Sequence, residues 1–195
     1  TEVEFLYEMF AAVSGSEQKL KDKPYFRVAV SPVSPLTYDK LSASALLKAA
    51  KKGLPTGVLP APSTGATAPV TFAGALAQQN AELLGGLVIL QTVNPGLPTE
   101  LSPRLSIMDM RTSFLSWGTS QLGMASSCAS QLLDHYDLPS DVYGLSTDAK
   151  LLDEQSGYEK AMNGLLPALA GADFLSGPGS LESGKDGDLI ILNDD

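Results

Sequence analysis

Apolar residues recur at helical spacing in five stretches of the chain. These stretches predict helices over residues 2–18, 38–52, 71–92, 119–136 and 154–170. Gly53 follows the second stretch directly, and glycine is typical of a helix end because it adopts left-handed backbone at little cost. The sequence NPG ends the third stretch in the same way.

Short apolar runs separate these helices and end in Pro, Ser, Thr or Gly. They predict strands over residues 25–30, 54–59, 98–101, 141–145, 173–176 and 188–192. Because strands and helices alternate in units of about 30 to 40 residues, the pattern favours βαβ repetition and a parallel sheet.

Two α/β architectures contain this repetition, the doubly wound sheet and the (β/α)₈ barrel. The chain has no dominant glycine-rich dinucleotide fingerprint, and several strand ends carry polar loops at once, which favours the barrel. A complete barrel usually needs about 250 residues. The chain has 195 residues, enough for only five or six units. We therefore expect a single domain over residues 1–195, an incomplete (β/α)₈ TIM-barrel that is part of a longer protein.

Composition and charge narrow the class of function. Hydrophobic residues make up 44% and charged residues 18% of the chain, which is a globular balance. The net charge of -9 argues against a nucleic-acid partner because no basic face is available for phosphates. No apolar run approaches about 18 residues, so no membrane span is expected, and without a signal peptide the expected location is cytoplasmic.

The single cysteine and single histidine exclude a disulfide framework and a multi-cysteine metal site. Cys128 lies in a stretch of small residues, so we expect a buried packing residue rather than a nucleophile. His135 lies near a predicted helix end, where a surface position is expected. No metal site is predicted.

The loop that precedes the third helix is rich in small and hydroxylated residues. It lacks both GxGxxG and GxxxxGK[ST], which disfavours a nucleotide site. Gly65 permits close backbone approach, and Pro69 lies near a helix start, where free N–H groups suit an anion such as a carboxylate. The residues leave two interpretations open, an ordinary turn and an anion-binding helix start.

Charged residues also follow the later strands. Asp153 and Glu154 are explained by a helix start, whereas Asp148 and Lys150 form a mixed-charge loop at the strand end. Glu182 lies in a glycine-rich loop after the fifth strand, and a structural ion pair is expected between Asp109 and Arg111. No spacing among these residues identifies acid–base catalysis, so catalytic residues stay unassigned.

Six phrases together resemble the trimethylamine methyltransferase family, in the order that the family has them. They are SPLTYD, GLPTGVLPAPSTGATAPVTFAGALAQQNAELLGG, NPGLP, DMRT, STDAKLLDEQSGYEKAMNGLLPALAGADF and GPGSLESG. The resemblance covers nearly the whole chain, and the second and fifth phrases are specific to the family. It implies a (β/α)₈ barrel that moves a methyl group from a methylated amine to a corrinoid protein.

Family members are longer than this chain, and some contain pyrrolysine and use trimethylamine. The chain contains only standard residues, so it resembles the non-pyrrolysine branch, in which a few members demethylate glycine betaine or similar quaternary amines. We take residues 146–150 as the strand end that matches the pyrrolysine position. The resemblance implies that the chain itself binds no cofactor and that the corrinoid methyl acceptor is carried by a partner protein.

A methylated ammonium group needs aromatic faces and a carboxylate, and the carboxylate of a betaine needs N–H donors or a cation. With the resemblance, these needs point to a substrate-binding set made of Gly65, Ala66, Thr67, Tyr143, Asp148, Lys150 and Glu182. Gly65, Ala66 and Thr67 are the candidate N–H donors. Tyr143 fits an inward core position equally well.

The sequence also leaves two alternative functions open and predicts how the isolated chain associates. The chain could be an amine-binding module without turnover, or another barrel enzyme with a phosphorylated substrate at the loop after residue 62. The absence of Lys and Arg from that loop disfavours the phosphate reading. An incomplete barrel leaves open strand edges, which predicts self-association or dependence on further chain segments.

Overall fold

The computed structural model describes residues 2–182, 186 and 187, and shows helices that alternate with short strands. The helices are α1 (Glu2–Ser14), α2 (Glu17–Asp22), α3 (Lys40–Lys52), α4 (Phe72–Val93), α5 (Ser120–His135) and α6 (Glu154–Leu169). The strands are β1 (Val28–Val30), β2 (Thr56–Val58), β3 (Ser63–Thr64), β4 (Thr99–Leu101), β5 (Ser106–Met108), β6 (Leu115–Ser116), β7 (Asp141–Tyr143), β8 (Phe174–Ser176), β9 (Ser180–Leu181) and β10 (Asp186–Gly187). The predicted α/β class is confirmed.

The main strands form one parallel row in chain order. β1 pairs with β2, β2 pairs with β4, and β7 pairs with β8, each in parallel. A parallel bridge between Leu101 and Ser140 joins the first part of the row to the second. A helix lies between each strand and the next. Because no described strand of this row breaks the chain order, the row lacks the reversal that a doubly wound sheet requires.

The parallel pairing of β2 with β4 continues beyond the ends of these two strands. The backbone N–H groups of Ser102, Arg104 and Ser106 donate to the carbonyls of Val58, Pro60 and Pro62 at 2.8, 3.0 and 3.1 Å. These bonds connect the β2–β4 pair to the β3–β5 pair. The prolines interrupt the regular ladder because they have no N–H group. The predicted strands 54–59 and 98–101 are thus observed as β2 and β4, and β3 and β5, which the sequence did not predict, continue their pairing.

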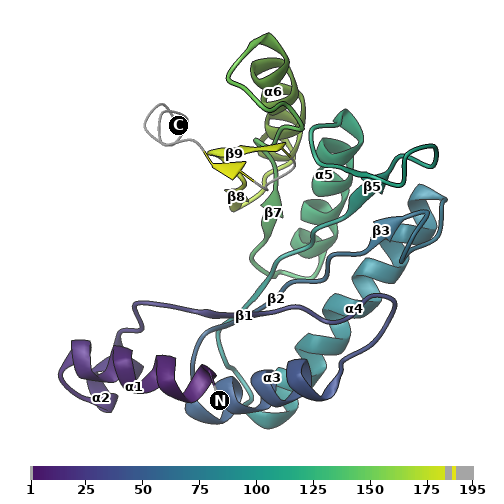
Figure 1. Ribbon diagram of the computed structural model, residues 1–195. Helices are drawn as coiled ribbons and strands as arrows, with labels where there is room; N and C mark the ends of the chain where they lie inside the picture. The colour runs from purple at the N-terminus through teal and green to yellow at the C-terminus, as the bar shows by residue number, and fades with distance from the viewer. Residues whose placement is uncertain (1, 183–185, 188–195) are drawn as a thin grey trace.

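The two faces of the row differ in polarity because successive side chains of a strand point to opposite sides. Val28, Val30, Val58 and Leu101 point to one face, where they pack with helix residues that include Leu46, Leu83 and Leu90. Figure 1 shows α3, α4, α5 and α6 following one another around this side of the strands. The opposite face carries small and polar residues, among them Ala29, Gly57 and Glu100.

The first predicted helix is the main error in the element assignment. Residues 2–18 do not form one helix, because the chain breaks at Gly15 and begins a second helix at Glu17. Gly15 has φ +84°, and the Ser16 side chain accepts a hydrogen bond from the N–H of Lys19 as an N-cap. Strand β6 and the β9–β10 pair were also missed. The predicted strand 188–192 lies outside the described residues.

The other helices begin and end within two residues of their predicted bounds. α3 has Asp39 as its N-cap and Gly53, at φ +72°, as its C-cap. Cys128 on α5 is half-buried, a shallower position than predicted, and His135 is exposed as the last residue of α5, as predicted. Within the described part of the chain, no helix is both long and apolar enough to cross a membrane.

Candidate functional site

Most of the predicted site residues lie at or after the carboxyl ends of parallel strands. The 65–67 loop follows β3, Tyr143 is the last residue of β7, and Asp148 and Lys150 follow it. Glu182 follows β9, a short strand that comes after β8 and pairs antiparallel with β10. The carboxyl ends of parallel strands meet at one edge of a sheet, and ligand sites of α/β proteins lie at that edge. The candidate site therefore lies among these loops.

Tyr143 and Asp148 are brought together by Trp117, a residue that the sequence did not single out. The Trp117 and Tyr143 rings meet edge to face, with centroids 5.0 Å apart and planes at 78°. The backbone N–H of Trp117 donates to Asp148 Oδ1 at 2.9 Å. All three residues are half-buried. The arrangement forms an aromatic corner beside a carboxylate, and the name "aromatic corner" is used below for Trp117, Tyr143 and Asp148.

Lys150 and Glu182 form a second pair in the neighbouring loop. Their Nζ and Oε1 atoms lie 3.5 Å apart, and the Glu182 backbone N–H donates to the carbonyl of Ala149 at 2.8 Å. The Lys150 side chain is 76% exposed, so water screens this ion pair. The pair ties the loop after β7 to the loop after β8.

The 65–67 loop forms a tight turn that uses its own N–H groups. Ala66 and Thr67 both donate to the carbonyl of Ser63 at 3.0 Å, and Gly65 donates to the carbonyl of Ala68 at 3.1 Å. The three predicted donors therefore already have acceptors within the loop. Gly65 has φ +79°, and a Cβ atom at this position would lie 2.6 Å from Met110 Sδ. Gly65 is thus needed both for the turn and for contact with the loop after β5.

Helix α4 contains the side chains that hold three of the loops. The Glu82 carboxylate, which is buried, accepts hydrogen bonds from Ser34 Oγ at 2.7 Å and from the Leu36 N–H at 2.9 Å. Gln78 Nε2 donates to the carbonyl of Thr67 at 2.7 Å. The amide oxygen of buried Gln79, in the orientation that its neighbours require, accepts from the N–H groups of Arg104 and Leu105 at 3.0 Å. The QQNAE phrase therefore positions loops at the carboxyl edge.

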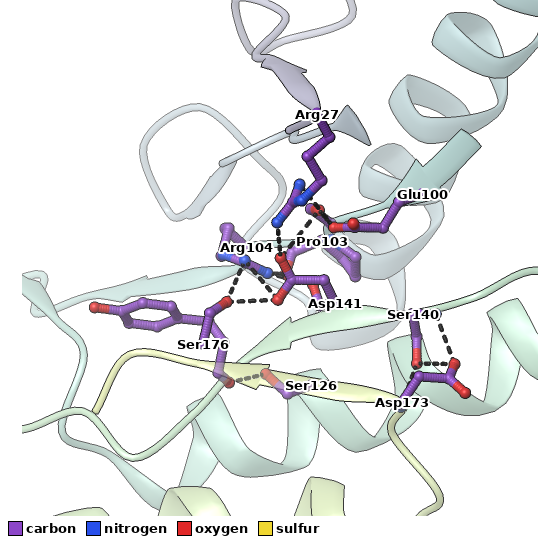
Figure 2. Close-up of polar contacts among 11 residues, drawn as sticks. Arg27, Glu100, Pro103, Arg104, Ser126, Ser140, Asp141, Asp173 and Ser176 are labelled. Atoms are coloured by element: carbon purple, nitrogen blue, oxygen red, sulfur yellow. Dashed lines mark hydrogen bonds and ion pairs between the residues drawn. The ribbon is translucent and has the colours of Figure 1, made fainter. Parts of the chain in front are cut away.

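Four charged residues meet on the polar face of the strands, as Figure 2 shows. Arg27 contacts Glu100 and Asp141, each at 2.8 Å. Arg104 contacts Asp141 Oδ1 at 3.0 Å, donates to Ser176 Oγ at 2.6 Å, and also donates to the Asp141 carbonyl. This set, called the inner network below, connects β1, β4, β7 and β8.

Burial and partner charges have opposite effects on the carboxylates of the inner network. Burial alone would raise the pKa of Asp141, but the Ser176 hydrogen bond and the Arg104 charge hold that pKa below its ordinary value. Burial raises the pKa of Glu100 above its ordinary value, although Ser102 donates to it and Arg27 lies beside it. Burial also lowers the pKa of Arg104.

Arg104 connects the inner network to the aromatic corner. Its guanidinium carbon lies 5.5 Å from the centroid of the Tyr143 ring, within cation–π range. Tyr143 is thus held between Arg104 and Trp117. The strand alternation that puts Asp141 on the polar face also puts Tyr143 there, two residues later. This position corresponds to the inward one that the sequence left open.

Some of these residues could have been found from the sequence. Glu100 and Asp141 are carboxylates inside predicted strands, a signal of a polar strand face. Trp117 gave no such signal, because it lies in the short segment between β6 and α5 and meets Tyr143 and Asp148 only through tertiary contacts. The ion pair predicted between Asp109 and Arg111 is present at 3.7 Å and is exposed.

Comparison with known proteins gives one consistent result. A family model described as "Trimethylamine methyltransferase (MTTB)" matches residues 1–185. The chain is 37% identical over 177 residues to trimethylamine methyltransferase MttB of Desulfitobacterium hafniense (strain DSM 10664 / DCB-2), covering 91% of the chain and 36% of that protein. It is 37% identical over 187 residues to MttB of Methanosarcina barkeri, covering 94% of the chain and 38% of that protein.

A relative with a different named substrate is also similar. The chain is 33% identical over 168 residues to glycine betaine methyltransferase of Desulfitobacterium hafniense (strain Y51), covering 86% of the chain and 35% of that protein. The chain therefore spans between 35% and 38% of the length of these three curated relatives.

Proposed function

Because the chain belongs to the trimethylamine methyltransferase family, we propose that its protein transfers a methyl group from a methylated amine to the Co(I) corrinoid of a partner protein. The match over residues 1–185 is the observation that carries the proposal. The relatives named for trimethylamine and for glycine betaine suggest the two substrates to test first.

We also propose that the strands belong to a (β/α)₈ barrel. The support is the parallel row in chain order, with a helix on one side between each strand of the row and the next. The aromatic corner then lies at the carboxyl edge, where barrel enzymes bind their substrates.

The chemistry asks for positioning more than for proton transfer. In a quaternary amine the nitrogen is already cationic, so when the C–N bond breaks, the electron pair stays on nitrogen and a neutral amine leaves. The corrinoid, when the partner presents it, supplies the nucleophile that takes the methyl group. The residues of this chain need to hold the cation in line and to exclude water.

The aromatic corner is the proposed cation site. Edge-to-face rings of Trp117 and Tyr143 offer two differently oriented aromatic surfaces, and Asp148 adds negative charge. Lys150 and Glu182 lie in the adjoining loop, where Lys150 would attract the carboxylate of a betaine and Glu182 the ammonium group. We propose that Gly65, Ala66 and Thr67 contribute a close backbone wall rather than N–H donors, since those N–H groups already have acceptors.

The test is methyl transfer to cob(I)alamin from a panel of trimethylamine, glycine betaine and further methylated amines, both tertiary and quaternary. We expect Co(I) to be consumed only when one of the amines is present, with the demethylated amine formed in equal amount. Absence of transfer from every amine would contradict the proposal. Calorimetric binding of an amine without transfer would instead support an amine-binding module without turnover.

A further inference from the structure

Glu159 on α6 holds the backbone of the loop that carries Asp148. Its Oε2 atom accepts a hydrogen bond from Thr147 Oγ1 at 2.7 Å and another from the Asp148 backbone N–H at 2.8 Å. Its Oε1 atom accepts from Gln155 Nε2 at 2.8 Å, one turn earlier on the same helix. Both oxygens of this half-buried carboxylate are therefore engaged in fixing its own position and that of the loop.

The loop is fixed in two further places. Thr147, which is fully buried, accepts a hydrogen bond at Oγ1 from the Ala149 N–H at 3.0 Å. The Ala149 carbonyl accepts from the Glu182 N–H at 2.8 Å. These hydrogen bonds connect the loop to α6 and to Glu182 in the segment after β8.

From this loop the contacts continue to the aromatic corner. The Asp148 carboxylate accepts from the Trp117 N–H at 2.9 Å, and the Trp117 ring meets Tyr143 at 5.0 Å. A displacement of the Asp148 backbone would therefore displace the Trp117 ring as well. Glu159 is connected to the aromatic corner through the Asp148 backbone.

Gly118, the residue after Trp117, leaves room for the Glu159 carboxylate. A Cβ atom at Gly118 would overlap Glu159 Oε2 and would lie 2.8 Å from the Asp148 nitrogen. Only glycine allows the 117–118 backbone to approach both groups this closely. The close approach is part of the same assembly and would be lost if the carboxylate moved.

We infer that Glu159 is a positioning residue for the methylated-amine site, which sets the place of Asp148 and Trp117 without touching the substrate. The inference rests on the proposed function for its substrate, and on the hydrogen bonds of Glu159 and Asp148 for its geometry. The hydrogen-bond acceptors of Glu159 perform this role, so an amide at the same position retains most of it.

The chain contains one tryptophan, so the emission of Trp117 reports on the aromatic corner directly. Emission, quenching by acrylamide and titration with glycine betaine and trimethylamine are measured for wild type, Glu159→Ala, Glu159→Gln and the control Glu154→Ala. Glu154 is exposed in the first turn of the same helix. We expect Glu159→Ala to shift the emission to longer wavelengths, to increase quenching, and to weaken amine binding about tenfold.

The conservative variant and the control should behave differently. Glu159→Gln should keep the wild-type emission and bind the amine within about threefold of wild type, because the amide oxygen still accepts from Thr147 and Asp148. Glu154→Ala should leave both readouts unchanged. Emission and quenching of Glu159→Ala that equal those of the control would overturn the inference.

A second variant and the methyl-transfer assay separate a folding defect and a failed proposed function from a failed inference. If Glu159→Ala does not fold, Thr147→Val removes one of the two donors to Glu159 Oε2 with little change in shape, and wild-type emission in that variant would overturn the inference. If wild type transfers no methyl group, the proposed function fails, whereas the emission comparison still decides whether Glu159 positions Trp117.

Discussion

At the scale of single residues, Asp141 is the most heavily bonded charge of the described chain interior. Its side chain is 3% exposed and contacts both Arg27 and Arg104, while Ser176 Oγ donates to it at 2.5 Å. A buried carboxylate with two arginines is stable only while every partner is present. Removing its charge leaves buried Arg104 without its carboxylate partner, whereas Arg27 still contacts Glu100.

Asp141→Asn should therefore lower the free energy of unfolding by about 3 kcal/mol, within the range for breaking a buried ion pair. Denaturant unfolding measures the change. The matched control is Asp109→Asn, whose partner Arg111 is 91% exposed, and which should change the free energy by less than about 0.5 kcal/mol. Equal effects of the two substitutions would show that the inner network adds no stability.

The Asp141 carboxylate should also make the free energy of unfolding decrease at acidic pH. The pKa of Asp141 is lower in the folded protein than its ordinary value of about 3.9, so the unfolded chain binds the proton first. Its contribution is complete above pH about 4 and is lost as the pH falls through the folded pKa. The difference in unfolding free energy between wild type and Asp141→Asn should shrink below pH 4. A constant difference down to pH about 2 would contradict this account.

The sequence predicted part of the proposed site and missed the rest for a physical reason. Tyr143 lies in the predicted strand 141–145 and Asp148 follows that strand, so their place near the carboxyl edge follows from chain order alone. Trp117 and Glu159 reach the same place through tertiary packing of α5 and α6, which no local pattern encodes. The roles of Gly65, Ala66 and Thr67 as ligand donors were inferred from composition, and the turn geometry uses their N–H groups internally.

At the scale of elements, α4 is both a core helix and a loop holder. Its buried face includes Leu83 and Leu90, while Gln78, Gln79 and Glu82 bond to loops near its N-terminal half. The glycines at 85 and 86 leave room for Tyr38, which packs against them. The Tyr38 hydroxyl donates to the carbonyl of Glu82 at 2.5 Å. The family-specific phrase that contains QQNAE therefore supplies the side chains that hold loops at the carboxyl edge of the strands.

Gly86→Ala should destabilise the protein, although alanine is the better helix former. A Cβ atom at position 86 would overlap the Tyr38 hydroxyl and lie 2.7 Å from Val58 Cγ1. We expect a loss of about 1 to 3 kcal/mol in denaturant unfolding from overpacking. Gly157→Ala on α6 is the control, since its Cβ would meet nothing within 4 Å, and it should gain about 0.5 to 1 kcal/mol. A gain in both variants would refute the packing argument.

Element boundaries were predictable where the signals are local and failed where they are not. α3 begins after its N-cap Asp39 and ends at its C-cap Gly53, and both residue types are local capping signals in the sequence. The short strands β3 and β5 were missed because their pairing continues past prolines, and a proline normally argues against a strand. The break at Gly15 was missed because the apolar spacing of α1 resembles that of a longer helix.

At the scale of the whole molecule, apolar side chains remain exposed on the terminal helices. On α6 these are Tyr158, Leu165, Leu166 and Leu169, and on α1 they are Phe5, Met9 and Val13. The two helices lie toward opposite ends of the row of strands (Figure 1). Contiguous exposed apolar surface of this kind marks a contact surface.

We predict that the isolated 195-residue chain self-associates through such surfaces. Light scattering should show species larger than a monomer, and the double substitution Leu165→Lys with Leu169→Lys should reduce their fraction. Leu41→Lys is the control, since Leu41 is 79% exposed on a different helix, α3. A monodisperse monomer before any substitution would contradict the prediction.

The central claim is that the aromatic corner binds the methylated amine whose methyl group is transferred. The most direct test is kcat/KM for methyl transfer to cob(I)alamin by wild type, Tyr143→Leu and Tyr25→Leu, with the amine of the panel that reacts. Tyr25 is 60% exposed and serves as the control. We predict that Tyr143→Leu lowers kcat/KM at least about tenfold, the size of a lost cation–π contact, and that Tyr25→Leu leaves it unchanged. Equal kcat/KM in Tyr143→Leu and wild type would contradict the claim.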